Sequence, residues 1–423
     1  MSSSDSLGLN PGGQAADPAC DAPAPLARLE EAGPEALRRL RVIVAKVLDS
    51  TQWRGGSSAE LSRRLGLDRS LGWKIWSLAE GSGAIPSPQH VPGRGGVRKF
   101  LEAARASGAP GTLLEQAQTA FTHFRDLSLQ HGSDRATADI LLGSLSSEGQ
   151  RRQDMALRRG LFRGNSLVLG TQVRLLYQCS VVFPGQKGSN PSVAMVRGVY
   201  GIRTTRPGVW WVVSRSTLVQ SGGPADPPRR VGLDGESIGL DAAPLLAEFC
   251  RPAHVRVRRR VVQGRTVQDE LAPRPMGRAG EVDVVTGEVV THIPADRHDR
   301  DAVTLAVRVP AEAMCFDVLL HRDAVIGEPR AACLSLVNTE FPFEDPQGRD
   351  EIPMTEELAD LGHGAGMAGL PDVPGHPTLL ERVIAATGHR ADAFRSFRLR
   401  MRFPPLPIVA AVTYVVRRSD AGT

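Results

Sequence analysis

Four short patterns in the sequence contain residue types that could do catalytic chemistry. Gly235-Glu-Ser-Ile-Gly239 has the Gly-x-Ser-x-Gly spacing of a serine nucleophile elbow, in which a buried strand must lead into the serine. Residues 227–234 are Pro-Pro-Arg-Arg-Val-Gly-Leu-Asp, which is too polar for a buried strand. We therefore interpret this pattern as a chance match.

Gly364-Ala-Gly-Met-Ala-Gly369 has the glycine spacing of a dinucleotide-binding turn. That turn requires a strand before it and a helix after it, and the flanking residues predict neither. His321-Arg-Asp323 matches the start of a protein-kinase catalytic loop, but Glu328 stands where the loop needs asparagine, and the other kinase motifs are missing. We expect a loop in the first case and a chance match in the second.

The remaining pattern is a potential metal cluster, and its residues are His292, Asp296, His298 and Asp299. Their spacing fits no tetrahedral arrangement, so a polar loop is the simpler interpretation. No phosphate-binding P-loop is found either. The sequence therefore predicts no catalytic residue, no metal and no cofactor, and we expect a protein that is not an enzyme.

The composition excludes several classes of protein. A length of 423 residues suggests two or three domains at roughly 150 residues each. Hydrophobic residues make up 41% and charged residues 23%, which is ordinary for a folded domain and excludes disordered or collagen-like chains. The longest nearly apolar run, Ile408–Val416, is far shorter than the about 20 residues of a membrane-spanning helix. We expect no membrane partner.

The cysteines and the N-terminus indicate a cytoplasmic protein. Five cysteines occur, and no pair has the Cys-x-x-Cys spacing, so a disulfide framework and a structural zinc site are both unexpected. The first 25 residues lack the basic start and apolar centre of a secretory signal. Almost all of the basic residues are arginines, a bias typical of GC-rich bacterial genomes.

Charge is unevenly distributed along the chain. The total is +5, but residues 36–105 hold 13 basic and five acidic residues, a net charge of +8. Residues 1–35 carry −5 and residues 340–360 carry −7. A compact basic segment points to a polyanion as a partner.

This basic segment contains the strongest local motif, between Ser57 and Gly81. Ser57 and Glu60 have the spacing of a capping box, and Gly66 is placed to end the first helix in the left-handed conformation. Asp68 can cap a second helix. The expected buried stripes are Leu61 and Leu65 on the first helix and Leu71, Ile75 and Leu78 on the second.

Two short helices joined by a tight glycine turn form a helix-turn-helix. Residues 36–85, with the sequence AELSRRLGLDRSLGWKIWSL at their centre, resemble the DNA-binding domain of bacterial helix-turn-helix regulators. An upstream helix, Leu37–Leu48, would supply the third helix. The resemblance implies that the second helix enters the major groove of double-stranded DNA with its N-terminal side chains at base edges. The residues expected at DNA are Arg63, Arg64, Arg69, Ser70, Trp73, Lys74 and Ser77.

The segment departs from such families in three places. Gly72 replaces a helix-favouring residue at a cost near 1 kcal/mol relative to alanine, Trp73 is unusual on a base-reading face, and residues 81–88 predict a loop in place of a wing hairpin. Two alternatives remain open: a helix-turn-helix used for protein contacts, and a plain helical hairpin.

Hydrophobic periodicity divides the chain into four parts. We expect a disordered tail over 1–33, the helix-turn-helix domain over 34–90, a helical linker or dimerisation region over 91–164 and a β-rich sensing or interaction domain over 165–423. The absence of strand–helix alternation argues against a parallel sheet. The predicted class is α+β, with an all-α N-terminal part and a mostly antiparallel β C-terminal part. A homodimer is one option.

Two predicted strands of the β-rich part alternate arginine with apolar residues. These strands place Arg256, Arg258 and Arg260 on one face and Arg398, Arg400 and Arg402 on another. One interpretation is a solvated sheet face, paired in part with the acidic residues 340–360. The other is an anion-binding surface for a small anionic effector or a nucleic acid.

Three hypotheses for the function follow. The first is a sequence-specific DNA-binding transcriptional regulator with a C-terminal effector or interaction domain. The second is a non-enzymatic interaction protein whose helix-turn-helix is structural, and it predicts no salt-dependent DNA binding. The third, an enzyme with its site in the β part, lacks a coherent set of reactive residues.

Overall fold

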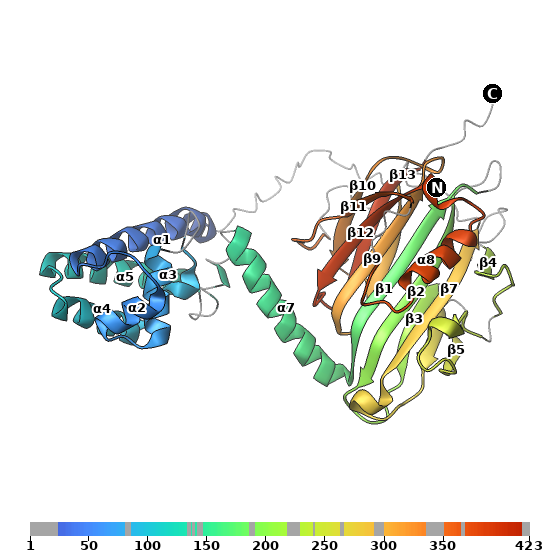
Figure 1. The fold of residues 1–423 in the computed structure, drawn as a ribbon, viewed down its shortest axis with the longest axis horizontal. Coiled ribbons are helices and arrows are strands. Elements are labelled where there is room, and N and C mark those ends of the chain that lie inside the picture. The colour runs from blue at the N-terminus through green and yellow to red at the C-terminus, as the bar shows by residue number, and fades with distance from the viewer. Residues whose placement is uncertain are drawn as a thin grey trace, which may run out of the picture. The chain divides into compact units, whose positions relative to one another are not determined.

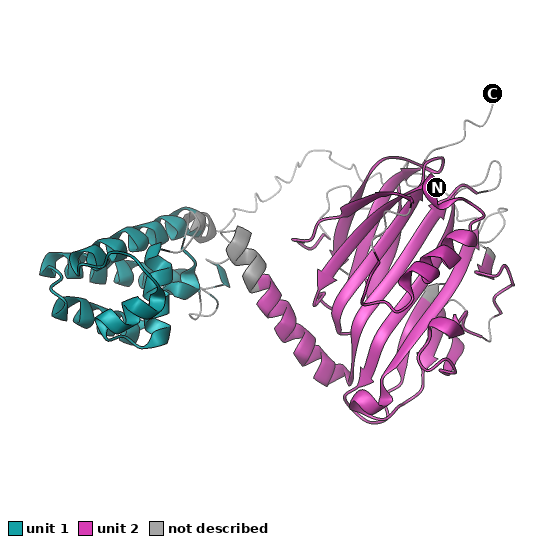
Figure 2. Cartoon of the chain, viewed as in Figure 1, with its two compact units in different colours: residues 1–153 teal, residues 154–423 magenta. Residues whose placement is uncertain are grey.

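The computed structural model describes residues 24–80, 86–132, 137, 140–141, 147–185, 191–217, 229–239, 242–262, 266–291, 300–335, 351–364 and 369–416. The chain divides into two compact units, residues 1–153 and residues 154–423 (Figure 2). Helices build the first unit and largely antiparallel strands build the second, so the protein is α+β as predicted (Figure 1).

The first unit has one apolar core to which all its helices contribute. The elements are α1 (Ala24–Ser50), α2 (Ser58–Leu65), α3 (Arg69–Glu80), the 3₁₀ turn η1 (Pro88–His90), α4 (Arg94–Ala106) and α5 (Gly111–His131). Leu40 of α1, Ile75 of α3, Phe100 of α4 and Phe121 of α5 are buried in this core. The helices α4 and α5, which we expected in a separate linker after residue 90, therefore fold together with α2 and α3.

The N-terminal boundary also differs from the prediction. Residues 1–23 lie outside the described residues, but α1 already begins at Ala24 and continues through Pro34. A proline inside a helix removes one backbone hydrogen bond. Leu29, upstream of the proline, is buried in the same core, and this burial offsets the missing bond. The predicted tail therefore ends before residue 24.

The second unit begins with the end of α7 (Ser147–Leu169) and contains a seven-stranded sheet in the order β11-β12-β9-β1-β2-β7-β4. The bounds of its strands are β1 Thr171–Phe183, β2 Ser192–Thr204, β4 Arg229–Gly232, β7 Val282–Thr291, β9 Ala311–His321, β11 Ala359–His363 and β12 Phe394–Arg402. Every neighbouring pair is antiparallel except β1 with β9, which is parallel.

Both faces of this large sheet are covered. A three-stranded sheet of β8 (Arg300–Val307), β10 (Val325–Ser335) and β13 (Ile408–Val416) shares its core on one face. Helix α8 (His376–Ala385) lies across the other face (Figure 1). Strands β1 and β9 are consequently buried along nearly their whole length, which explains their continuous apolar sequences.

A third sheet joins β3 (Trp211–Thr217), β6 (Thr266–Leu271) and β5 (Val257–Val262) in that order. Short 3₁₀ turns occur at η2 (Ala247–Phe249), η3 (Gly277–Gly280) and η6 (Ala391–Ala393). Among the described residues, no helix combines the length and the apolar composition needed to cross a bilayer.

Two local expectations about strands were wrong. The apolar alternation of residues 167–183 predicts one long strand, but β1 begins only at Thr171, because α7 continues to Leu169 and Gly170 follows with a φ of 73°. The residue pair Thr286-Gly287, between two short Val-rich runs, is typical of a hairpin turn, but it lies in the interior of β7, which runs unbroken between β2 and β4. A Cβ at Gly287 would lie 2.7 Å from Leu233 Cδ1, so this glycine allows a close approach instead of a turn.

Candidate functional site

The turn that joins α2 to α3 has the predicted local structure. Ser57 Oγ accepts from the backbone N–H of Glu60 at 3.3 Å, and Glu60 Oε2 accepts from the Ser57 N–H at 2.8 Å, which confirms the capping box. The bond from the Ser57 N–H, together with one from the Ser57 hydroxyl to Glu60 Oε2 at 3.1 Å, holds the pKa of Glu60 below its ordinary value. Gly66 ends α2 with a φ of 63°. Leu61 and Leu65 are buried as expected.

Helix α3 is held firmly against the rest of the first unit. Asp68 Oδ1 accepts from the Leu71 N–H at 2.9 Å and so caps the helix as predicted. The expected stripe of Leu71, Ile75 and Leu78 is buried. The indole of Trp76 donates to the Gly56 carbonyl at 2.8 Å, and that of Trp53 donates to Glu80 Oε1 at 2.7 Å. The two indoles attach α3 to the segment between α1 and α2.

Gly72, which the sequence marks as a departure, lies where α3 crosses α2. A Cβ at this position would lie 1.9 Å from Ser62 Oγ and 2.9 Å from Ser62 Cβ. The glycine therefore permits the close packing of the two helices, and its weak helix propensity is offset by that contact.

Gly72→Ala is therefore expected to destabilise the first unit, although alanine is the better helix former. The gain in helix propensity is about 1 kcal/mol, whereas overpacking of a close contact costs about 1–3 kcal/mol. Urea unfolding measures the net effect, and Gly72→Ala combined with Ser62→Gly should restore stability relative to Ser62→Gly alone. A more stable single variant would contradict the close contact.

The outer surface of α3 is basic at its N-terminal end. Arg69, Ser70 and Trp73 are exposed, and Lys74 is half-buried. The Trp73 side chain is 47% exposed, and its ring contacts His90 of η1 edge-on at a centroid distance of 4.9 Å. Four of the five residues predicted on α3 therefore lie together at one end of the helix.

Ser77 does not belong to this surface. It is 5% exposed, although its helical spacing predicts the outer face. Trp73 lies one turn before Ser77, and η1 packs against α3 at that point. The turn η1 thus packs against α3 at the place in the chain where a winged helix-turn-helix would have its wing hairpin. Residues 81–85 of this connection lie outside the described residues.

Arg63 and Arg64 lie in the last turn of α2 and are both exposed. The Arg64 guanidinium donates to the Thr51 carbonyl at 2.9 Å, which orients it toward the end of α1. A cation at a helix C-terminus is favourable on its own. The contact that the structure shows is therefore a local one, and phosphate contacts by the pair stay a prediction.

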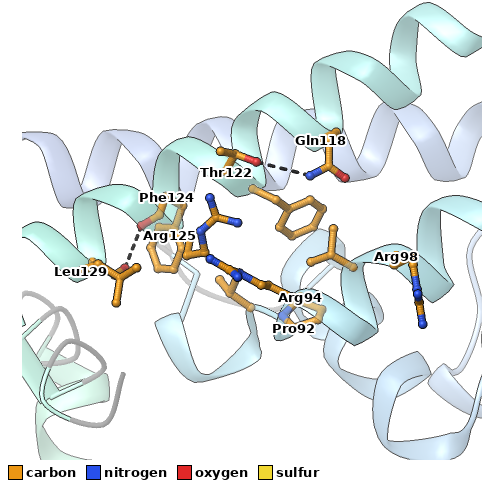
Figure 3. A pocket seen from close by; sticks show the side chains of 12 residues that line it. Pro92, Arg94, Arg98, Gln118, Thr122, Phe124, Arg125 and Leu129 are labelled. Atoms are coloured by element: carbon orange, nitrogen blue, oxygen red, sulfur yellow. Dashed lines mark hydrogen bonds between the residues drawn. The ribbon is translucent and has the colours of Figure 1, made fainter. Parts of the chain in front are cut away.

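A groove of about 650 Å³ lies between α4, α5 and the segment that follows η1. Figure 3 shows Arg94, Arg98 and Arg125 around it, with the Gln118 amide donating to Thr122 Oγ1 at 3.3 Å. Arg125 is paired with Asp126 at 2.8 Å. Val91 and Pro92 line the groove next to η1, so one short segment touches both the groove and α3.

The predicted arginine face of β5 is largely neutralised. Arg258 and Arg260 both pair with Glu270 of β6, at 2.5 and 3.3 Å, and Arg256 remains exposed just before the strand. Arg259, on the opposite face, is the buried arginine, and it forms a two-fold pair with Asp269 at 2.7 and 3.0 Å. Among the described residues, Arg256 is thus the one arginine of this face without an acidic partner.

The predicted arginine face of β12 points toward the side of the sheet that carries α8. Arg398 forms a two-fold pair with Asp317 of β9 at 2.7 and 2.9 Å, and Arg400 pairs with Asp372 at 2.6 Å. Arg402 stacks on Phe403 with its guanidinium 5.5 Å from the ring centre. Residues 351–360, the described part of the expected acidic partner region 340–360, supply none of these contacts, and residues 340–350 lie outside the described residues.

Asp317 is the centre of a buried polar cluster that the sequence analysis missed. The Tyr177 hydroxyl donates to Asp317 Oδ2 at 3.1 Å and lies 3.0 Å from His376 Nε2 at the start of α8. All three side chains are about 1% exposed. A single aspartate inside the apolar strand Met314–Leu320 was the available signal, since a buried carboxylate requires a cationic partner.

This cluster has the residue types of a catalytic site but lacks its properties. Burial raises the pKa of the neighbouring thiols of Cys179 and Cys315, which keeps them protonated. Burial also raises the pKa of Tyr177 well above its ordinary value. With no solvent access, the cluster holds α8 and β12 on β9 and β1. The potential metal ligands of residues 292–299 lie outside the described residues.

Comparison with known proteins gives no family. No protein-family model matches the chain, and no curated protein matches it. A solved structure of a candidate protease from Parabacteroides distasonis ATCC 8503 aligns with 58% of this chain at 8% identity and a TM-score of 0.26. The alignment spans 40% of that chain's length. A TM-score of this size supports neither a shared fold nor a shared activity.

Proposed function

We propose that the protein is a sequence-specific DNA-binding transcriptional regulator that reads duplex DNA with α3. The β-rich unit is the effector or interaction domain in this proposal. The observation that carries it is the exposed, basic N-terminal end of α3, which is presented by a rigid glycine turn. Arg69, Ser70, Trp73 and Lys74 cluster there.

The arrangement meets the physical requirements of a recognition helix. In such helices the N-terminal residues reach base edges. The burial of Ser77 therefore removes from the predicted DNA contacts only one residue, which lies further along the helix. Arg69 and Lys74 can donate to guanine or phosphate, and the Trp73 ring can contact a thymine methyl group. Arg63 and Arg64 would then position the protein on the phosphate backbone.

Replacing Arg69 and Lys74 together by alanine should lower the affinity for a bound genomic fragment by about 10- to 100-fold. Loss of a base contact costs about 1–3 kcal/mol, and loss of a phosphate contact reduces the salt dependence of binding. Footprinting of the tagged protein on its own genome first identifies the fragments. Fluorescence anisotropy over a range of salt concentrations then compares the variants.

Lys99→Ala/Arg105→Ala is the matched control, because it removes one lysine and one arginine from exposed positions of α4. The control should retain sequence preference and lose only the general electrostatic part of binding. Equal loss in both double variants would show that α3 reads no bases. The absence of any salt-dependent DNA binding would instead favour the interaction-protein hypothesis.

A further inference from the structure

A cleft of about 640 Å³ opens in the second unit where three sheets meet. Strands β1 and β2 of the large sheet, β3 of the small sheet and β8 of the covering sheet form its walls. Its apolar lining includes Leu176, Val199 and Leu305. This volume and this lining are typical of sites for small organic molecules.

The charged side chains that line the cleft are all positive. Arg197, Arg215 and Arg308 line it, and no carboxylate occurs among the lining residues that the structure describes. Arg197 already has an acidic partner, because it pairs with Glu288 at 3.1 Å. The other two arginines decide what the cleft can bind.

Arg215 and Arg308 have no acidic partner among the described residues. The guanidinium of Arg215 donates to the amide oxygen of Gln268 at 3.0 and 3.2 Å, in the amide orientation that satisfies both groups, and this neutral partner leaves its charge uncompensated. The pKa of Arg308 lies below its ordinary value. The larger cause is the partial loss of hydration of its guanidinium, and the smaller is the positive charge of Arg215. Two like charges therefore repel each other at the cleft, and an anion between them would remove that repulsion.

Aromatic side chains complete the lining. Trp210 precedes β3, Trp211 is its first residue, and both line the cleft. The Arg258 guanidinium lies 4.5 Å from the Trp210 ring centre, which holds that indole in place. A flat apolar group could stack against either indole.

We propose that this cleft binds a small organic anion, whose carboxylate, sulfonate or phosphate lies between Arg215 and Arg308 and whose planar apolar part packs against Trp211. Binding itself does not depend on DNA recognition. Only the role of this anion as the effector of the regulator rests on the function proposed above.

The test uses two fluorescent probes with nearly the same aromatic rings. The probe 8-anilino-1-naphthalenesulfonate carries a sulfonate, and N-phenyl-1-naphthylamine is its uncharged counterpart. The full chain is titrated with each probe in the absence of DNA. Hydrogen–deuterium exchange with the anionic probe bound should show protection of β3 and β8, which separates this cleft from the groove between α4 and α5.

Arg215→Ala/Arg308→Ala should weaken binding of the anionic probe at least about tenfold, since each lost charge-assisted contact is worth roughly 1.5 kcal/mol or more. Binding of the uncharged probe should change less than about twofold. The matched control, Arg256→Ala/Arg322→Ala, removes two exposed arginines outside the cleft and should bind both probes as the wild type does. Equal losses for both probes, or protection confined to the first unit, would overturn the proposal.

Discussion

Arg398→Met is expected to lower the free energy of unfolding of the β-rich unit by about 3–5 kcal/mol at pH 7. The substitution removes the guanidinium that pairs with Asp317 and leaves a carboxylate that is 1% exposed. Tyr177 remains within hydrogen-bonding distance of Asp317, but its hydroxyl carries no charge that could compensate the buried carboxylate. Urea unfolding followed by hydrogen–deuterium exchange of β9 and β12 peptides measures the loss.

The effect of Arg398→Met should shrink as the pH falls. In the wild type, burial would raise the pKa of Asp317, but hydrogen bonds from Arg398 and His376 outweigh it and hold the pKa below its ordinary value. The ion pair therefore stabilises the fold above that ordinary value, near 4, and this contribution is lost as the pH falls through the depressed pKa. In the variant the carboxyl becomes protonated at a higher pH, which relieves its uncompensated charge.

A double variant separates the loss of an ion pair from a packing defect. Arg398→Met/Asp317→Leu replaces both partners by apolar side chains and should recover most of the stability, because buried pairs are often replaceable in this way. The hydrogen bond between Tyr177 and His376 survives in it. A double variant as unstable as Arg398→Met, or a loss that does not vary with pH, would contradict this account of the cluster.

Arg259→Ala is expected to produce a loss of similar size, about 3–5 kcal/mol, in the small sheet. Its side chain is 6% exposed and pairs with Asp269, which is 1% exposed and also accepts from Ser214 Oγ at 3.0 Å. The substitution leaves a carboxylate enclosed between β3, β5 and β6. Exchange protection of these strands should fall, and the cleft wall formed by β3 should loosen with them.

The neighbouring arginines provide the controls for Arg259→Ala. Arg258→Ala removes a half-exposed pair with Glu270 and should cost no more than about 1 kcal/mol. Arg256→Ala should change stability by less than about 0.5 kcal/mol, since its side chain is exposed. If Arg258→Ala were as damaging as Arg259→Ala, the predicted face of alternating arginines, and not the buried pair, would hold this sheet together.

The caps, the turn and the apolar stripes of the α2–α3 segment could be predicted from the sequence. The capping box at Ser57, the left-handed Gly66, the cap at Asp68 and the buried stripe of α3 all depend on neighbours within one or two helical turns. Such short-range interactions are visible in a sequence. The division into a helical and a β-rich part followed from periodicity for the same reason.

Features that depend on distant residues were not predictable from the sequence. The burial of Ser77, the close approach of Gly72 to Ser62 and the extension of α1 to Ala24 each depend on contacts with residues that are distant in the sequence. The alternation of arginines identified the exposed face of β5 correctly but not which charges are compensated. The partners Asp317 and Glu270 come from other strands, and sequence spacing does not reveal strand pairing.

The sequence by itself determined the helical character of the first unit, the glycine turn between α2 and α3, and the α+β class, because periodicity and capping are local properties. Tertiary structure alone decided which arginines form buried ion pairs and which remain available to bind an anion. Arg259 and Arg398 are held by carboxylates from neighbouring strands, whereas Arg215 and Arg308 line a cleft with no acidic partner among the described residues. Charge compensation acts through space, and only the folded chain brings the opposing charges within reach.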